Sequence, residues 1–256
     1  AKSIEQLEFD PNSITDIISI SCTGLMAPGL EISLANHFKL NQSVNRHGIN
    51  YMGCYAALHG LRLASSIVSN NPEAQVLLVA VELSTLHYQN SVEREAILSN
   101  LLFGDGAVAI KISGHKSPES LSINDYNSLL LSKGKEMMKW SVGNLGFEME
   151  LSSKVPGLLE ENSDLLKQKL PGADLHAIHP GGKKIIENIA SIFSADDTSK
   201  QAAFQVLSQY GNMSSPSIIF VLKQLLEGGL QNDSKILGLA FGPGISVESV
   251  LMKYHA

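Results

Sequence analysis

The stretch that decides the fold is GCYAALHGLRLASSIVSNNPEAQVLLVAVE, residues 53–82. Apolar residues recur at intervals of four, three and four within residues 57–68, so they fall on one face of a helix. Asn-Asn-Pro at 70–72 ends this pattern. The next segment, QVLLVAVE (75–82), is almost continuously apolar, which is typical of a strand buried on both faces. The stretch therefore predicts a helix followed by a buried strand.

The same order of elements occurs a second time, in residues 211–254. A glycine-containing turn opens a helical pattern with Pro216 in its first turn, and a pair of glycines ends it. The strand-like segment KILGLAFGPG (235–244) follows, and then a second one, ISVESVLMKY (245–254). In the first copy the corresponding second strand is GDGAVAIKI (104–112). Turn, helix, strand, glycine loop and strand thus occur twice, which predicts two related α/β halves with one functional residue at each helix N-terminus.

The length of 256 residues allows one large domain or two moderate ones, and 44% apolar with 17% charged residues supports a sizeable core. The polar stretch 113–127 is the predicted connection. It divides the chain into a first half, residues 1–112, and a second half, residues 113–256. Fewer elements precede the repeat in the first half than in the second. We therefore expect the N-terminal part to be missing, and the chain to be about two-thirds of a longer protein.

Composition excludes several function classes. The net charge of −6 does not suit nucleic-acid binding, and no apolar run approaches the length of a membrane span. The first residues, AKSIEQLEFD (1–10), lack the apolar core of a signal peptide, so we expect a cytoplasmic protein. The two cysteines, Cys22 and Cys54, are too few for a disulfide framework, and no suitably spaced histidines predict a metal site with them.

Cys54 is the first candidate for chemistry. It follows Gly53 in the predicted turn, where backbone N–H groups and the helix dipole favour a thiolate. A free cysteine is more often a small buried apolar residue, and position alone leaves both interpretations open.

Two further candidates lie in the second half. His179, in HAIHPGGKK (176–184), ends a short apolar strand, which places an imidazole at the carboxyl edge of a sheet. Asn212, in QYGNMSSPS (209–217), has a helix N-cap as its ordinary role. We expect Ser214 and Ser215 to cap that helix instead, which frees the Asn212 side chain.

Two glycine loops accompany these residues, FGDG (103–106) and FGPG (241–244). Neither has the pattern of a P-loop or of a dinucleotide-binding motif. They predict close approach of the backbone to the site, with ordinary turn chemistry as the alternative.

Taken together, these segments resemble the type III polyketide synthases, the family that includes chalcone and stilbene synthases. The resemblance extends from about residue 15 to the end, and its most specific part is the pairing of YGNMSS with IHPGG. The matching segments are, in chain order, GCYA (53–56), LRLA (61–64), LFGDGA (102–107), VPGL (155–158), IHPGG (178–182), YGNMSS (210–215), FGPG (241–244) and SVE (246–248).

The resemblance implies a thiolase-like α/β fold, five layers α-β-α-β-α made of two duplicated halves, and a homodimer. It implies a polyketide synthase-type acyltransferase that loads an acyl-CoA starter on Cys54 and extends it with malonyl-CoA by decarboxylative Claisen condensation. His179 would pair with the thiolate and assist decarboxylation, and Asn212 would assist the same step and orient the thioester carbonyl. Neutral donors suit an enolate oxygen, whereas a carboxylate would repel it. Coenzyme A thioesters are substrates, and the chemistry requires no metal or redox cofactor.

The resemblance also implies residues that shape the substrate pocket. Tyr88 and Met149 fall at or near positions where the family has gatekeeping phenylalanines. Cys22 and Thr23 fall where small residues line the cavity. Lys184 falls where a basic residue contacts a coenzyme A phosphate, although a solvated helix charge is an equally good interpretation. The remaining substrate-binding positions belong to the two Gly-Pro motifs and are Gly181, Phe241, Gly242 and Pro243.

Two alternatives remain. A β-ketoacyl-ACP synthase III has Cys, His and Asn on the same fold, without the YGNMSS context, and would use malonyl-ACP. An inactive, truncated homologue that only dimerises is favoured by the short N-terminal part. Retention of all three candidate catalytic residues weighs against it.

Overall fold

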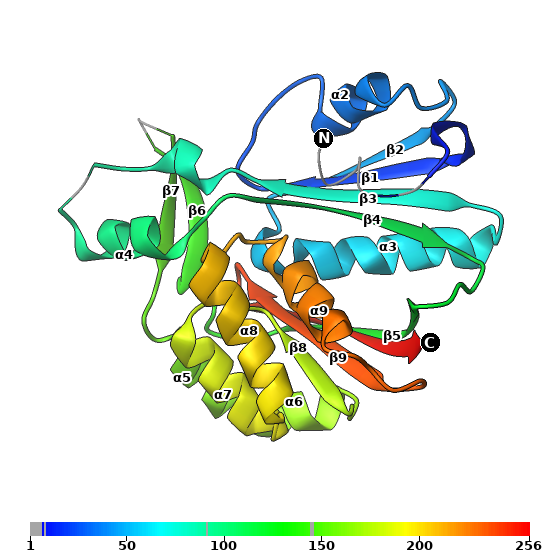
Figure 1. Ribbon diagram of the computed structural model, residues 1–256. Helices are drawn as coiled ribbons and strands as arrows, with labels where there is room; N and C mark the ends of the chain where they lie inside the picture. The colour runs from blue at the N-terminus through cyan, green and yellow to red at the C-terminus, as the bar shows by residue number, and fades with distance from the viewer. Residues whose placement is uncertain (1–6, 8, 91, 144–145) are drawn as a thin grey trace.

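The computed structural model describes residues 7, 9–90, 92–143 and 146–256. Figure 1 shows two four-stranded sheets with helices between them and on their outer faces. The first half contains η1 (Pro11–Ser13), β1 (Asp16–Ser21), α2 (Leu30–His37), β2 (Asn45–Asn50), η2 (Gly53–Tyr55), α3 (Ala56–Asn70), β3 (Gln75–Glu82), η3 (Ser84–His87), α4 (Arg94–Leu102) and β4 (Gly106–Ser113).

The second half repeats this alternation and adds a hairpin and outer helices. It contains β5 (Ser120–Leu130), β6 (Met138–Gly143), β7 (Gly146–Leu151), α5 (Val155–Glu161), α6 (Ser163–Lys169), β8 (Leu175–Ile178), α7 (Lys183–Phe193), α8 (Asp197–Tyr210), α9 (Ser217–Glu227), β9 (Lys235–Gly242) and β10 (Ser246–His255).

The first sheet has the strand order β2-β1-β3-β4. β1 pairs in parallel with β2 and β3, and β4 returns antiparallel to β3. β3 is the apolar run predicted as a buried strand, and residues 76–80 are all buried because α2 and α3 cover opposite faces of this sheet. The predicted helix and its buried strand are both confirmed.

The second sheet has the order β5-β10-β9-β8, with β8 parallel to β9 and β10 antiparallel to both of its neighbours. The predicted connection 113–127 is wrong in its second part, because β5 begins at Ser120 and pairs with β10 along its length. β5 is an edge strand whose side chains are only half-buried or exposed. Its polar composition therefore hides a strand, as is common at sheet edges.

The layers run α-β-α-β-α, as the resemblance implied. α3 lies between the two sheets, in contact with β3, β1 and β10, and α9 lies beside it against β8 and β9. α2 forms one outer layer, and α5, α6 and α7 form the other (Figure 1). The predicted apolar face of α3 is buried at Ala57, Leu61 and Ala64, and only Val68 at its end is half-buried.

A third, two-stranded sheet lies to one side. It is the hairpin of β6 and β7, and Figure 1 places it next to α4 and the loop after β3. Because β3 carries η3 directly after it, the hairpin packs against residues that follow the carboxyl end of the first sheet. Within the described ranges, no helix is long and apolar enough to cross a membrane.

Candidate active site

Cys54 lies in the 3-10 turn η2, directly before α3. Gly53 has φ +80°, and a Cβ atom there would lie 2.5 Å from Pro243 Cδ. A Cβ at Gly242 would likewise lie 2.5 Å from the ring of Tyr55. The glycine loop of the second half therefore packs directly on the turn that carries the cysteine of the first half, which is the close approach predicted for these loops.

Asn212 lies in the turn between α8 and α9, and its backbone holds it. Its N–H donates to Leu102 O at 2.8 Å, and its carbonyl accepts from Gly104 N at 3.0 Å. A Cβ at Gly104 would lie 2.4 Å from the carbonyl oxygen of Tyr210. Here the glycine loop of the first half packs on the turn of the second half, so the two contacts are reciprocal.

The Asn212 side chain closes its own turn, because its Oδ1 accepts the N–H of Ser214 at 2.9 Å. Ser214 has φ +56°, a conformation that non-glycine residues adopt mainly where the surroundings enforce it. The expectation that a serine caps the following helix is wrong. α9 begins at Ser217 with Pro216 at the N-cap and no side-chain cap, because Ser217 Oγ accepts the N–H of Met213.

His179 directly follows β8. Its backbone N–H donates to Leu239 O at 2.8 Å, and its carbonyl accepts from Gly181 N at 2.8 Å, which fixes the strand-to-helix turn. The side chain is 1% exposed, and neither ring nitrogen has a hydrogen-bond partner in the described part of the chain. Burial lowers the pKa of His179 to about 3, so the resting imidazole is neutral.

The resting thiol of Cys54 is neutral as well. Its pKa is raised to about 11, chiefly by burial and also by the Glu82 charge, and hydrogen bonding by the side chains of Ser214 and Asn212 limits the rise. The expected pair of thiolate and imidazolium is therefore not the resting state. Desolvation disfavours both charged forms, and at these two buried side chains it outweighs the helix N-terminus.

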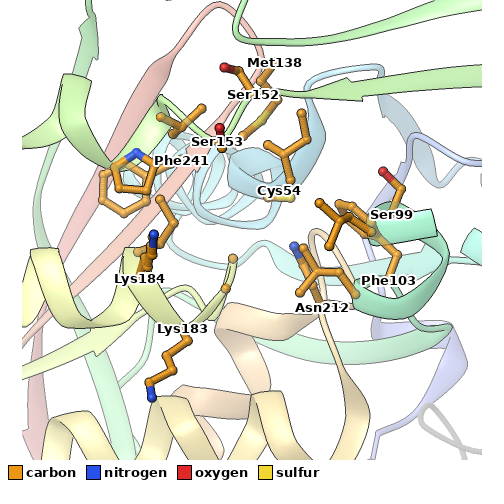
Figure 2. Close-up of a pocket in the computed structure, with 18 of the residues that line it drawn as sticks. Cys54, Ser99, Phe103, Met138, Ser152, Ser153, Lys183, Lys184, Asn212 and Phe241 are labelled. Atoms are coloured by element: carbon orange, nitrogen blue, oxygen red, sulfur yellow. The ribbon is translucent and has the colours of Figure 1, made fainter. Parts of the chain in front are cut away.

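Cys54, His179 and Asn212 line one cavity of about 450 Å³. Figure 2 shows Cys54 and Asn212 close together on one side, with Lys183 and Lys184 on the other. Of the predicted substrate-binding residues, Gly181, Lys184 and Phe241 also line this cavity. The walls are otherwise mainly apolar, with side chains from α4, the hairpin and α5, among them Leu98, Leu102, Met138, Leu151 and Val155.

Four of the predicted pocket residues lie behind the turns instead of on the cavity wall. Gly242 and Pro243 pack on the cysteine turn, as described above. Cys22 is buried, its Sγ accepts the N–H of Gly53 at 3.0 Å, and burial raises its pKa to about 12. Thr23 hydrogen bonds through both its N–H and its hydroxyl to Glu82. These four residues therefore contribute to the cavity indirectly, by packing and hydrogen bonds that fix the turns lining it.

Tyr88 and Met149 do not line the cavity of Cys54. They line a second cavity of about 320 Å³, together with residues of η3, α4 and the hairpin, and Tyr88 is 67% exposed. The aromatic residue shared by both cavities is Phe103, with Ser99 beside it. Sequence reasoning missed Phe103, although it is the first residue of the FGDG loop and the only aromatic residue within residues 89–125 of the sequence.

The second cavity has an aromatic wall. The rings of His87, Trp140 and Phe147 pack against one another, with centroids 5.0–5.7 Å apart. His87 is fixed by a bond of 2.6 Å between its Nε2 and the carbonyl oxygen of Thr23. In the described residues, no three side chains of His, Cys, Asp or Glu come together in a way that could hold a metal ion.

Two α/β halves contribute Cys54, His179 and Asn212 to one cavity, in the five-layered arrangement that the resemblance implied, and comparison with known proteins gives the family. The family models of chalcone and stilbene synthases match the chain, the N-terminal domain at residues 2–116 and the C-terminal domain at residues 123–255. The chain therefore belongs to the chalcone and stilbene synthase family, whose bacterial relatives are type III polyketide synthases.

The similar proteins include bacterial and amoebal polyketide synthases. The chain is 29% identical to the α-pyrone synthesis polyketide synthase-like Pks18 of Mycobacterium tuberculosis, over 98% of the chain and 67% of the relative. It is 30% identical to Polyketide synthase 37 of Dictyostelium discoideum, over 98% of the chain but 9% of that protein. The crystal structure of 1,3,6,8-tetrahydroxynaphthalene synthase from Streptomyces coelicolor superimposes with a TM-score of 0.92 at 28% identity, covering all of this chain and 76% of the other.

Proposed function

We propose that the chain is the catalytic part of a type III polyketide synthase. It takes an acyl group from a coenzyme A thioester onto Cys54 and extends it with malonyl-CoA by decarboxylative Claisen condensation. The observation that carries this proposal is that Cys54, His179 and Asn212, which come from two halves of the chain, line the same mainly apolar cavity.

In the loading step, the sulfur of Cys54 attacks the thioester carbonyl carbon, and the bond from that carbon to the coenzyme A sulfur breaks. The thiol proton of Cys54 leaves with coenzyme A as its free thiol, so the exchange is balanced. The unpartnered ring nitrogens of His179 make it the group that can carry this proton, although both groups are neutral at rest. When the thioester binds in the cavity, its carbonyl carbon becomes the atom that accepts the electron pair of the Cys54 sulfur.

In the extension step, malonyl-CoA loses CO2, and the electron pair of the broken bond moves into an enolate of the remaining thioester. A neutral imidazole N–H and an amide N–H are suitable donors to that oxygen, and the lowered pKa of His179 keeps the imidazole neutral over the working pH range. The enolate carbon then attacks the acyl carbonyl on Cys54, and the thiolate leaves. The diketide remains on coenzyme A.

The test of this function is intact-protein mass after mixing with a panel of acyl-CoAs, with Cys54→Ala as the matched variant. We expect a gain of one acyl group in the parent protein and none in the variant. A second arm supplies malonyl-CoA or malonyl-ACP and measures CO2 release. Release from malonyl-ACP alone would favour a β-ketoacyl-ACP synthase III and overturn the proposal. No acylation and no release from either donor would favour an inactive homologue.

We further propose that the chain works as a homodimer in the cytoplasm, with coenzyme A thioesters as its only small-molecule partners and no resident cofactor. The proposed steps need no redox or Lewis-acid group, and two free thiols suit a reducing compartment. Exposed apolar side chains at the carboxyl edge of the first sheet, namely Leu25, Met26 and Leu86, support a dimer contact there. Light scattering of Leu25→Glu should give a monomer where the parent gives a dimer.

A further inference from the structure

Glu82 is a buried carboxylate that neither the sequence analysis nor the proposed steps use. It is the last residue of β3 and has no exposed surface. In the described chain no Lys, Arg or His forms an ion pair with it. A carboxylate in such a place is costly unless donors satisfy it, so its contacts show what it does there.

Four donors surround the Glu82 carboxylate, and they come from both halves of the protein. Oε2 accepts from Cys22 N at 3.0 Å, from Thr23 N at 3.1 Å and from Thr23 Oγ1 at 2.8 Å. Oε1 accepts from Ser215 Oγ at 2.8 Å. Only a carboxylate offers two acceptor-only oxygens at this spacing.

Each side of this carboxylate leads to one catalytic turn. On one side, Cys22 Sγ accepts the N–H of Gly53, the residue before Cys54. On the other side, Ser215 directly follows Ser214, whose N–H donates to Asn212 Oδ1. Glu82 therefore lies between the cysteine turn and the asparagine turn, and hydrogen bonds together with short stretches of backbone connect it to both.

We propose that Glu82 is a positioning residue that fixes the turn of Asn212 relative to Cys54 across the boundary between the halves. The proposal rests on the proposed function, because it assigns Glu82 to the alignment of the nucleophile with the amide that assists decarboxylation. Glu82 is not among the residues that line the cavity of Cys54. It acts through Ser215 on one side and through Cys22 on the other.

The structure separates two effects of Glu82 on the Cys54 thiol, and they have opposite signs. The negative charge of Glu82 raises the thiol pKa, whereas the side chains of Ser214 and Asn212, which the Ser215 contact holds in place, lower it. Removing the charge while keeping the hydrogen bonds should lower the thiol pKa. Removing the Ser215 contact while keeping the charge should raise it. The first shift reports the charge of Glu82 alone, and the second shift, together with a loss of kcat, reports the positioning of the asparagine turn.

The ionisable groups near Cys54 are few. Among the described residues they are Glu82, Cys22 and His179, with Lys183 and Lys184 lining the same cavity and Tyr55 next in the chain. His179 is neutral throughout the neutral and alkaline range because burial lowers its pKa to about 3. Burial is the largest cause of the raised pKa of Cys54, and the Glu82 charge and the hydrogen bonds to the sulfur are the contributions that substitutions at Glu82 and Ser215 change.

The experiment uses the full chain with Glu82→Gln, Ser215→Ala and the control Ser199→Ala. Gln keeps one acceptor oxygen for Cys22 and Thr23, and its amide can donate to Ser215 Oγ. Ser199 is an equally buried serine whose hydroxyl accepts from His176 N, away from the cavity. The first readout is the rate of alkylation by iodoacetamide from pH 7 to 10, followed at the Cys54 peptide by mass spectrometry so that Cys22 is read separately. This range lies below the midpoint near pH 11, where the rate is proportional to the thiolate fraction, so the displacement of the rate curve along the pH axis gives the shift of the midpoint. The second is CO2 release from malonyl-CoA, resolved into kcat and KM.

We expect Glu82→Gln to move the alkylation midpoint down by about one pH unit, the usual effect of losing a nearby like charge, and to keep most of the decarboxylation. Ser215→Ala should move the midpoint up and lower kcat about tenfold with KM unchanged, because the amide is displaced from its working position. Ser199→Ala should change neither readout. Circular dichroism and thermal melting confirm that each variant is folded.

A folded Ser215→Ala with parental kcat would overturn the proposal, as would a folded Glu82→Gln that loses as much kcat as Ser215→Ala. If the parent chain releases no CO2 from malonyl-CoA, the proposed function fails. The alkylation readout still tests Glu82, because it needs no coenzyme A substrate, and unshifted midpoints in both variants would reject it.

Discussion

The turn of Cys54 and the turn of Asn212 are equivalent positions in the two halves, but they are built differently. Both lie at the start of a helix in the middle layer, α3 and α9, and both are covered by a glycine loop of the other half. The cysteine turn contacts the ring of Pro243 and is held through the sulfur of Cys22. The asparagine turn is held by two backbone hydrogen bonds to residues 102 and 104.

This difference separates two tasks. A backbone bridge fixes the main chain of Asn212 without using its side chain, so the amide nitrogen is left for chemistry while Oδ1 closes the turn. The cysteine turn has a positive φ at Gly53 and depends on close packing, which presents the sulfur at the cavity wall. In the proposed mechanism, one turn orients a neutral donor and the other presents the nucleophile to the shared cavity.

The largest expected effects come from removing the two side chains themselves. Cys54→Ala should abolish acyl loading but leave malonyl-CoA decarboxylation, because the donors to the enolate oxygen remain. Asn212→Ala should keep acyl loading and lower decarboxylation by about 10²–10³-fold, the usual cost of one lost donor to a developing oxyanion. Intact mass measures loading and CO2 release measures decarboxylation. Equal loss of both activities in both variants would mean that the turns do not divide the tasks.

The next effect concerns the glycine under the cysteine. Gly53→Ala places a Cβ 2.5 Å from Pro243 Cδ at φ +80°, so we expect a loss of about 2–3 kcal/mol in the free energy of unfolding. Gly157→Ala is the matched control, because a Cβ there meets no atom within 4 Å and the residue is inside α5. It should stabilise by about 0.5–1 kcal/mol. Urea unfolding of both variants measures the difference.

Substitution of Gly104, the corresponding glycine in the FGDG loop of the first half, should lower the free energy of unfolding by less. Gly104→Ala places a Cβ 2.4 Å from the carbonyl oxygen of Tyr210, without a positive φ, so we expect a loss of about 1–2 kcal/mol as the asparagine turn shifts. Acyl loading on Cys54 should continue while CO2 release falls. If loading falls instead, the backbone bridge supports both turns and the contrast between them is lost.

The last effect concerns stability in acid. The pKa of His179 is lowered to about 3 in the folded chain, below its ordinary value near 6.5, so the unfolded chain binds a proton that the folded chain does not. Stability from this group is therefore lost as pH falls from about 6.5 to 3. His179→Gln removes the titrating group, so its melting temperature should fall less between pH 7 and pH 4.5 than that of the parent. Parallel melting curves at both pH values would contradict the burial of a neutral imidazole.

Most of the fold could be predicted from the regular spacing of apolar residues and from the Gly, Asn and Pro residues at the ends of helices and strands. The helix and strand of residues 53–82 and the second copy after Asn212 are where their patterns indicate, because both lie in the buried middle of the molecule. β5 was missed because an exposed edge strand carries little apolar signal. The division of the chain at residues 112 and 113 stays a prediction.

The three catalytic candidates could be found from the turns that carry them, because a turn is a local property of the sequence. Their surroundings could not. Tyr88 and Met149 line the neighbouring cavity while Phe103 lies between the two, since the position of the β6–β7 hairpin is a tertiary property. Glu82 had one signal, a lone charge at the end of an apolar strand, but its four donors come from segments far apart in the chain.

The reciprocal glycine loops also bear on how the protein folds. Each half supplies the cover for the other's turn, and the paired segments are distant in sequence, so both contacts close a long loop of chain. Such contacts form late, after each sheet has assembled from its nearer neighbours. During refolding, the alkylation rate of Cys54 by a thiol reagent should therefore fall to its native value last. The time of this fall would measure when the two halves dock.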